Sequence, residues 1–195
     1  EIAQCLVGSE MCIRDSKYSN ERFDPSDIMT DPGEKGLDGV AICVNGRVIT
    51  SNDELESILG EAKSLDVRFV FIQTKTSEHF DGDEIGTFIY GVKAFFAPEA
   101  LRPQTNEKMD NLISLKDEIY RHSIDMTNAP VLDLYYVCCG KWVEGNGLMS
   151  RVNLDIQPLI DTQNFSSVAF FPYDSEKIIT TYKDCLLYTS PSPRD

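Results

Sequence analysis

The stretch Val67-Arg68-Phe69-Val70-Phe71-Ile72-Gln73 decides the fold that this sequence predicts. It is apolar at nearly every position and rich in β-branched and aromatic residues, which favour strands. A strand that is exposed on one face alternates apolar with polar residues, whereas a strand covered on both faces is apolar almost throughout. We therefore expect residues 67–73 to form a strand in the middle of a sheet, with residues 69–72 almost fully buried.

The segment before this strand predicts a β-hairpin and a helix. Two apolar runs, residues 40–44 and 47–50, are separated by Asn45-Gly46, a pair that tolerates the positive φ angles of a tight hairpin turn. Ser51 and Glu54 then form a capping box, which is typical of a helix start. The apolar residues that follow recur at helical spacing as far as Leu65, which predicts one buried helix face.

Helices and strands alternate along the rest of the chain. Apolar periodicity predicts helices over residues 81–96, 106–122, 148–160 and 175–183, the third interrupted by Pro158, and strands over residues 131–137 and 168–171. We expect the strands over 40–44 and 131–137 to flank the central strand. The alternation indicates an α/β fold, in which helices flank the sheet.

The composition is ordinary for one globular domain, with 42% apolar and 26% charged residues in a chain of 195. The longest apolar run is far shorter than the ~20 residues that span a bilayer, so no membrane association is expected. No basic segment leads into an apolar run at the start, so no secretory signal is expected either. The net charge of −14 excludes a generally basic nucleic-acid binder, although it leaves room for a local basic site.

The two ends of the chain show neither helical nor strand periodicity. Residues 5–16 and 185–195 resemble, almost word for word, translated sequencing-adaptor reads that contaminate assembled metagenomes. We therefore expect 1–16 and 185–195 to be non-native segments, and 17–184 to be an α/β domain that is a fragment of a longer protein. A natural disordered tail is the alternative interpretation.

Three cysteines, Cys43, Cys138 and Cys139, lie within residues 17–184. Adjacent residues on a strand point to opposite faces, so Cys138 and Cys139 are not expected to share a tetrahedral metal. An odd number of cysteines inside apolar strands is typical of buried thiols in a reducing compartment, which predicts a cytoplasmic protein.

Two short motifs carry side chains with useful chemistry. Asp38 lies between glycines in Gly36-Leu37-Asp38-Gly39, at the start of the hairpin. Gln73 and Lys75 lie two residues apart at the end of the central strand, so they point to the same side. If the two strands are adjacent, Asp38, Gln73 and Lys75 converge at one edge of the sheet.

This set of side chains suits the hydrolysis of a phosphodiester bond. The carboxylate of Asp38 and the amide oxygen of Gln73 are ligands for a hard cation such as Mg²⁺, which polarises a phosphate and lowers the pKa of a bound water. Lys75 would orient or deprotonate that water, or offset the charge that develops on phosphorus. The alternative is structural, because an Asp before a hairpin is commonly a turn residue and a Lys at a strand end is commonly solvated.

Asp81, Asp83 and Glu84 form an acidic group at the start of a predicted helix. Such a group has the composition of a metal site. Capping of the helix N-terminus and the favourable interaction of carboxylates with the helix dipole explain the group more simply, and we favour that interpretation.

The motifs of this sequence resemble the N-terminal region of the AIPR proteins, named for abortive infection phage resistance. The resemblance covers about residues 20–184 and rests on Gly36-Leu37-Asp38-Gly39-Val40, Val44-Asn45-Gly46, Phe71-Ile72-Gln73-Thr74-Lys75-Thr76-Ser77 and Gly91-Val92-Lys93-Ala94-Phe95-Phe96. That region is similar in turn to restriction-endonuclease-like nucleases of the Mrr type, whose motif is Asp, then Glu or Gln, one residue, and Lys. Asp38, Gln73 and Lys75 match this motif.

The resemblance implies a PD-(D/E)XK nuclease fold with a mixed sheet, Mg²⁺ dependence, a nucleic-acid substrate (DNA or RNA) and a role in prokaryotic antiviral defence. Two departures bear on activity. The fold normally supplies a further acidic residue from a helix before the Asp strand, and Glu21 is the remaining candidate. Gln73 in place of Glu removes one negative charge at the metal, which weakens cation binding.

Two hypotheses for the function follow. The first is a metal-dependent nuclease domain of an antiphage protein, supported by the ordered Asp38, Gln73 and Lys75. The second is a catalytically inactive α/β binding or assembly domain of a defence protein, supported by the net negative charge, because phosphate affinity comes mainly from Lys and Arg. The C-terminal portion typical of the AIPR proteins does not follow residue 184, so inactivity of this fragment would not exclude a nuclease as its parent protein.

Overall fold

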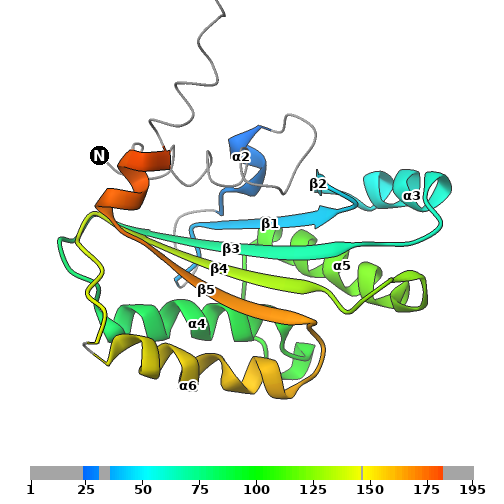
Figure 1. Cartoon of the computed structure of the whole chain (residues 1–195). Helices are drawn as coiled ribbons and strands as arrows, with labels where there is room; N and C mark the ends of the chain where they lie inside the picture. The colour runs from blue at the N-terminus through cyan, green and yellow to red at the C-terminus, as the bar shows by residue number, and fades with distance from the viewer. Residues whose placement is uncertain (1–23, 31–35, 146, 182–195) are drawn as a thin grey trace, which may run out of the picture.

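The computed structural model describes residues 24–30, 36–145 and 147–181 of the chain, and these form one mixed sheet with helices on both faces (Figure 1). The strands run in the order β2-β1-β3-β4-β5 across the sheet. Their bounds are Gly39–Val44 for β1, Arg47–Ile49 for β2, Val67–Lys75 for β3, Val131–Cys138 for β4 and Ser167–Tyr173 for β5. The predicted α/β class and mixed sheet are confirmed.

Strand β3 occupies the centre of this sheet. It pairs with β1 in antiparallel and with β4 in parallel orientation, and β4 pairs with β5 in parallel. The exposed fraction is 0% for Phe69, Val70 and Phe71 and 2% for Ile72. The prediction of a doubly covered central strand, flanked by the strands that contain residues 40–44 and 131–137, is therefore confirmed.

The helices cover the two faces of the sheet unequally. The main helices are α3 (Asn52–Glu61), α4 (Gly82–Phe96), α5 (Glu107–Arg121) and α6 (Leu148–Asp161), and all four add buried side chains to the larger core around Phe69 and Phe71. Figure 1 shows α4 and α6 side by side beneath the sheet. The short helix α2 (Pro25–Ile28) and the helical residues 175–181 pack on the opposite face through Ile28 and Ile178.

Two short 3-10 helices complete the connections, η1 (Glu99–Leu101) after α4 and η2 (Ser123–Asp125) after α5. Two local sequence signals behave as predicted. Asn45 and Gly46 have φ angles of 51° and 75°, as a two-residue turn between β1 and β2 requires. Ser51 and Glu54 form both hydrogen bonds of the capping box at the start of α3.

Two helix predictions were wrong in detail. Helix α3 ends at Glu61, with an extended Ala62 after it, and Leu65 forms an isolated parallel bridge with Met126. Leu65 is buried as expected, but it lies in the segment that connects α3 to β3 and not in the helix. Helix α6 continues through Pro158 to Asp161. Because Ile156 and Leu159 are buried on either side of the proline, core packing holds the last turn despite the missing N–H.

The segments 1–16 and 185–195, predicted to be non-native, lie outside the described residues, as does Glu21. In the part of the chain that the structure describes, none of the helices combines the length and the apolarity needed to cross a membrane.

Two of the three central cysteines are buried, Cys43 within β1 and Cys138 at the end of β4. The prediction was wrong for Cys139, which is exposed. Cys139 lies one residue beyond β4, where the chain leaves the sheet. Its side chain is therefore not buried by the packing that covers the residues of β4.

Replacing Phe71 with Ala should lower the free energy of unfolding by about 3–5 kcal/mol, because the change removes buried area and leaves a cavity. The Phe71 ring makes edge-on contacts with Phe95 and Phe96 at centroid distances of 5.1 and 5.8 Å, so neighbouring rings cannot collapse into the gap without breaking contacts of their own. Chemical denaturation measures the loss. Ile124→Ala, at a side chain that is 92% exposed, is the control and should change stability little. A loss below about 1 kcal/mol for Phe71→Ala would contradict the central position of β3.

In the folded protein, Cys139 should react with an alkylating reagent near pH ~8 far faster than Cys43, because the thiolate is the reactive species. Burial raises the pKa of Cys43 to about 12, so its thiolate is scarce under these conditions. Peptide mass spectrometry after alkylation assigns the label to each cysteine. Unfolding should remove the difference, and equal labelling of the two thiols in the folded protein would show that β1 is not buried.

Candidate functional site

The pairing of β1 with β3 brings the two predicted motifs together. The strands are antiparallel, so the start of β1 lies beside the end of β3, with Gly39 opposite Ile72. The backbone N–H of Asp38 donates to the carbonyl of Ile72 at 2.9 Å. Asp38 is therefore hydrogen-bonded to the residue that precedes Gln73 on the neighbouring strand, although 35 positions separate Asp38 from Gln73 in the sequence.

One oxygen of Asp38 accepts three hydrogen bonds from the end of β3. The backbone N–H of Thr74, the hydroxyl of Thr74 and the side-chain amide of Gln73 all donate to Oδ2 at 2.7 Å. Hydrogen bonds to a charged acceptor are stronger than neutral ones. Asp38 therefore joins β1 to β3 through its side chain. The side-chain hydrogen bonds that Asp38 accepts from described residues all end on Oδ2, and none of them ends on Oδ1.

Gln73 is oriented by this contact. Its Nε2 donates to Asp38 Oδ2 and, at 3.1 Å, to the carbonyl of Thr74, and the reverse amide orientation would set two oxygens against each other. The side chain is only 5% exposed, yet its Oε1 is buried without a hydrogen-bond partner among the described residues. Leaving a buried carbonyl oxygen unsatisfied costs free energy, so such an atom requires an explanation.

Lys75 forms an ion pair with Glu84 from the first turn of α4, with 3.3 Å between Nζ and Oε1. The hydroxyl of Tyr136 on β4 lies 3.4 Å from the other oxygen, Oε2, and donates to it. Burial of the Tyr136 ring and the nearby charge of Glu84 both raise the pKa of the Tyr136 hydroxyl, which therefore remains a donor. Glu84 is held between one cation and one neutral donor.

These side chains line a single cavity of about 360 Å³ at the end of the sheet. Its lining consists of Gly36, Asp38, Gln73, Lys75, Glu84 and Thr87. The structure thus brings together the three residues that the sequence singled out, from two strands, and adds a carboxylate from a helix. All of them lie on the face of the sheet that α4 covers.

Gly36 sets the approach of the Asp38 loop to helix α4. Its φ angle is +75°, in the left-handed region, and a Cβ atom there would lie 3.0 Å from the backbone of Phe88 and of Thr87. A side chain would therefore be strained both by the backbone conformation and by the contact. The glycine lets the loop lie directly against α4, and this contact brings Asp38 and Glu84 to the same cavity.

Sequence reasoning assigned Glu84 to helix capping, whereas in the structure Glu84 lines the cavity. Capping was the right explanation for Asp81, whose side chain accepts from the N–H groups of Asp83 and Glu84 at 2.8 and 3.0 Å. Capping does not explain Glu84 itself, whose carboxylate turns to Lys75. The available signal was its position four residues before the buried Phe88, on the helix face that meets the sheet.

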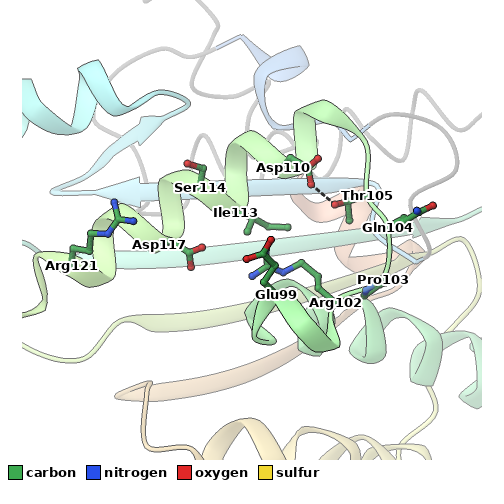
Figure 2. Close-up of a pocket in the computed structure, with 10 residues that line it drawn as sticks. All are labelled: Glu99, Arg102, Pro103, Gln104, Thr105, Asp110, Ile113, Ser114, Asp117 and Arg121. Carbon is green, nitrogen blue, oxygen red and sulfur yellow. Dashed lines mark hydrogen bonds between the residues drawn. The ribbon is translucent and has the colours of Figure 1, made fainter.

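A larger hollow of about 660 Å³ lies between η1 and α5 (Figure 2). Its lining mixes charges of both signs, from Glu99, Asp110, Asp117, Arg102 and Arg121. The Thr105 hydroxyl donates to Asp110, the dashed contact in Figure 2. None of the residues that the sequence predicted for catalysis or metal binding lies in this hollow, so the cavity at the end of β3 is the candidate site.

Comparisons of this chain with models of protein families, with curated protein sequences and with solved structures give no match. The resemblance to the AIPR proteins thus stays a prediction that rests on the motifs quoted above.

Proposed function

We propose that this domain is a Mg²⁺-dependent nuclease that cleaves phosphodiester bonds, and that it belongs to a prokaryotic antiphage protein related to the AIPR proteins. The observation that supports this most is the shared cavity of Asp38, Gln73 and Lys75, which come from two strands and match the nuclease motif in order. A cytoplasmic location is part of the proposal, on the basis of the unpaired thiols of Cys43 and Cys138.

The donor set at the cavity fits a small hard cation. Within the described ranges, no three His, Cys, Asp or Glu side chains are grouped as metal ligands. Mg²⁺, however, is commonly bound through one or two carboxylates together with substrate phosphate and water. Asp38 offers a carboxylate, and the partnerless Oε1 of Gln73 offers a buried neutral oxygen. Asp38 and Gln73 are therefore the residues that would hold the ion.

Each residue of the site has a distinct role in the proposed reaction. Bound Mg²⁺ would polarise the scissile phosphate and acidify the attacking water. Thr74 positions Asp38 through two hydrogen bonds, so the carboxylate is oriented before any ligand arrives. The ammonium group of Lys75 offsets the negative charge that develops on the phosphoryl oxygens, or orients the attacking water.

A catalytically inactive binding or assembly domain is the second candidate function. Two observations favour it: the three hydrogen bonds that already engage Asp38 Oδ2, and the net charge of −14, which opposes the binding of nucleic acid. On this hypothesis, Asp38 serves only to join β1 to β3.

Asp38→Asn and Lys75→Ala should each lower Mg²⁺-dependent cleavage of DNA or RNA by roughly 10²–10³, the loss typical of removing one group that stabilises transition-state charge. The double variant should lose much less than the product of the two single losses, because both groups act on one transition state. Initial rates on end-labelled DNA and RNA, with Mg²⁺ or with a chelator, measure the effect.

Lys63→Ala is the matched control for these two variants, since Lys63 is exposed and precedes the opposite end of β3. Its rate should equal that of the unmodified chain. Thermal unfolding identifies any variant whose loss reflects a folding defect. A folded Lys75→Ala protein that cleaves at the original rate would exclude the nuclease function and leave the binding domain.

Gln73→Glu should destabilise the cation-free protein by about 1–3 kcal/mol, because it replaces the hydrogen bond to Asp38 with a repulsion between carboxylates. Mg²⁺ should restore the stability, since it neutralises both groups. Thermal unfolding in a chelator and in Mg²⁺ measures both effects. Gln157→Glu is the control, because Gln157 donates to Asp161 at 2.8 Å on the exposed surface of α6. An effect of Mg²⁺ of the same size on both variants would contradict a cation site at Gln73.

A further inference from the structure

We infer that Glu84 supplies a second carboxylate to the cation site, and that it compensates for the neutral Gln73. The inference rests on the proposed Mg²⁺ site at Asp38 and Gln73. It assigns a role to a side chain that comes from helix α4 rather than from the strand motif.

The position of the Glu84 carboxylate is defined from two sides. Lys75 Nζ approaches Oε1 from β3, and the Tyr136 hydroxyl donates to Oε2 from β4, at 3.3 and 3.4 Å. Glu84 and Asp38 line the same cavity, on the face of the sheet that α4 covers. The head group is therefore directed toward the strand ends, although 42% of the side chain remains exposed.

Gln73, which lines the cavity, also carries a buried atom that needs a partner. Only 5% of Gln73 is exposed, and its Oε1 accepts no hydrogen bond from the described residues. A cation held between Asp38, Gln73 and Glu84 would satisfy this oxygen. Two carboxylates and one amide oxygen would also match the charge of a divalent ion, whereas Asp38 and Gln73 together supply one negative charge.

The neighbouring acid provides a natural comparison. Asp83 precedes Glu84 in the first turn of α4, but its carboxylate pairs with Arg151 of α6 at 2.7 Å and does not line the cavity. Asp83 and Glu84 therefore share the same element and the same formal charge and differ in direction. Any long-range effect of removing one negative charge near the site should be similar for both.

The test is the binding of Mg²⁺, and of Mn²⁺ as a second probe, by the full chain in isothermal titration calorimetry, without substrate. Glu84→Gln should weaken binding at least about tenfold, because even the loss of a residue that only hydrogen-bonds to a metal ligand typically lowers metal affinity by about that factor. Asp83→Asn should leave the affinity within about twofold of the original, as a screened surface charge would. Tyr136→Phe, which removes only the hydroxyl, should give a smaller loss and serves as a second variant if Glu84→Gln fails to fold.

Three outcomes can be distinguished. If binding depends on Asp38 but is unchanged in both Glu84→Gln and Tyr136→Phe, the inference is wrong and the proposed site at Asp38 and Gln73 stands. Equal losses for Asp83→Asn and Glu84→Gln would also overturn it, because the effect would then be general electrostatics. If the unmodified chain binds neither ion, the proposed nuclease function fails and the role of Glu84 fails with it.

Discussion

The burial of strand β3 on both faces is the constraint on which the rest of the structure depends. β3 pairs along its length with β1 on one side and β4 on the other, so its backbone hydrogen bonds are satisfied inside the sheet. Its rings then contact those of α4 on one face, with Phe69 and Phe96 at 5.2 Å. A slip of one residue would move every β3 side chain to the opposite face. Gln73 and Lys75 would then point away from α4, and the cavity would lose two of its residues.

The cavity inherits its geometry from this strand, and the same contacts serve stability and the proposed chemistry. The hydrogen bonds from Thr74 and Gln73 to Asp38 hold the start of β1 against the end of β3. They also orient the Asp38 carboxylate at the end of the sheet where the cavity lies. The ion pair of Lys75 with Glu84 connects the strand to α4 in a similar way. A partly exposed pair of this kind adds little to stability, so its value is in directing two charged head groups to one place.

The charge of the protein limits how a nucleic acid could approach this place. With a net charge of −14, the chain as a whole repels phosphate. Among the described residues that line the cavity, Lys75 alone carries a positive charge, and Glu84 offsets it. A divalent cation would reverse the local sign of charge, which connects the proposed cation site to the proposed binding of nucleic acid. Without a cation, the arrangement suits a domain that binds something other than phosphate.

The sequence by itself determined the central strand, the hairpin at Asn45-Gly46 and the cap at Ser51, because each depends on burial or hydrogen bonds within a few residues. It also placed Gln73 and Lys75 on one side, since strand side chains alternate with a period of two. Only the tertiary structure decided that Asp38 accepts from Gln73 and that Glu84, unlike Asp83, faces the cavity. It also decided that Cys139 is exposed and that α6 continues through Pro158. These features depend on how β1 pairs with β3, on where the chain leaves β4 and on how α4 and α6 pack against the sheet. Contacts between segments far apart in the chain leave no local pattern in the sequence.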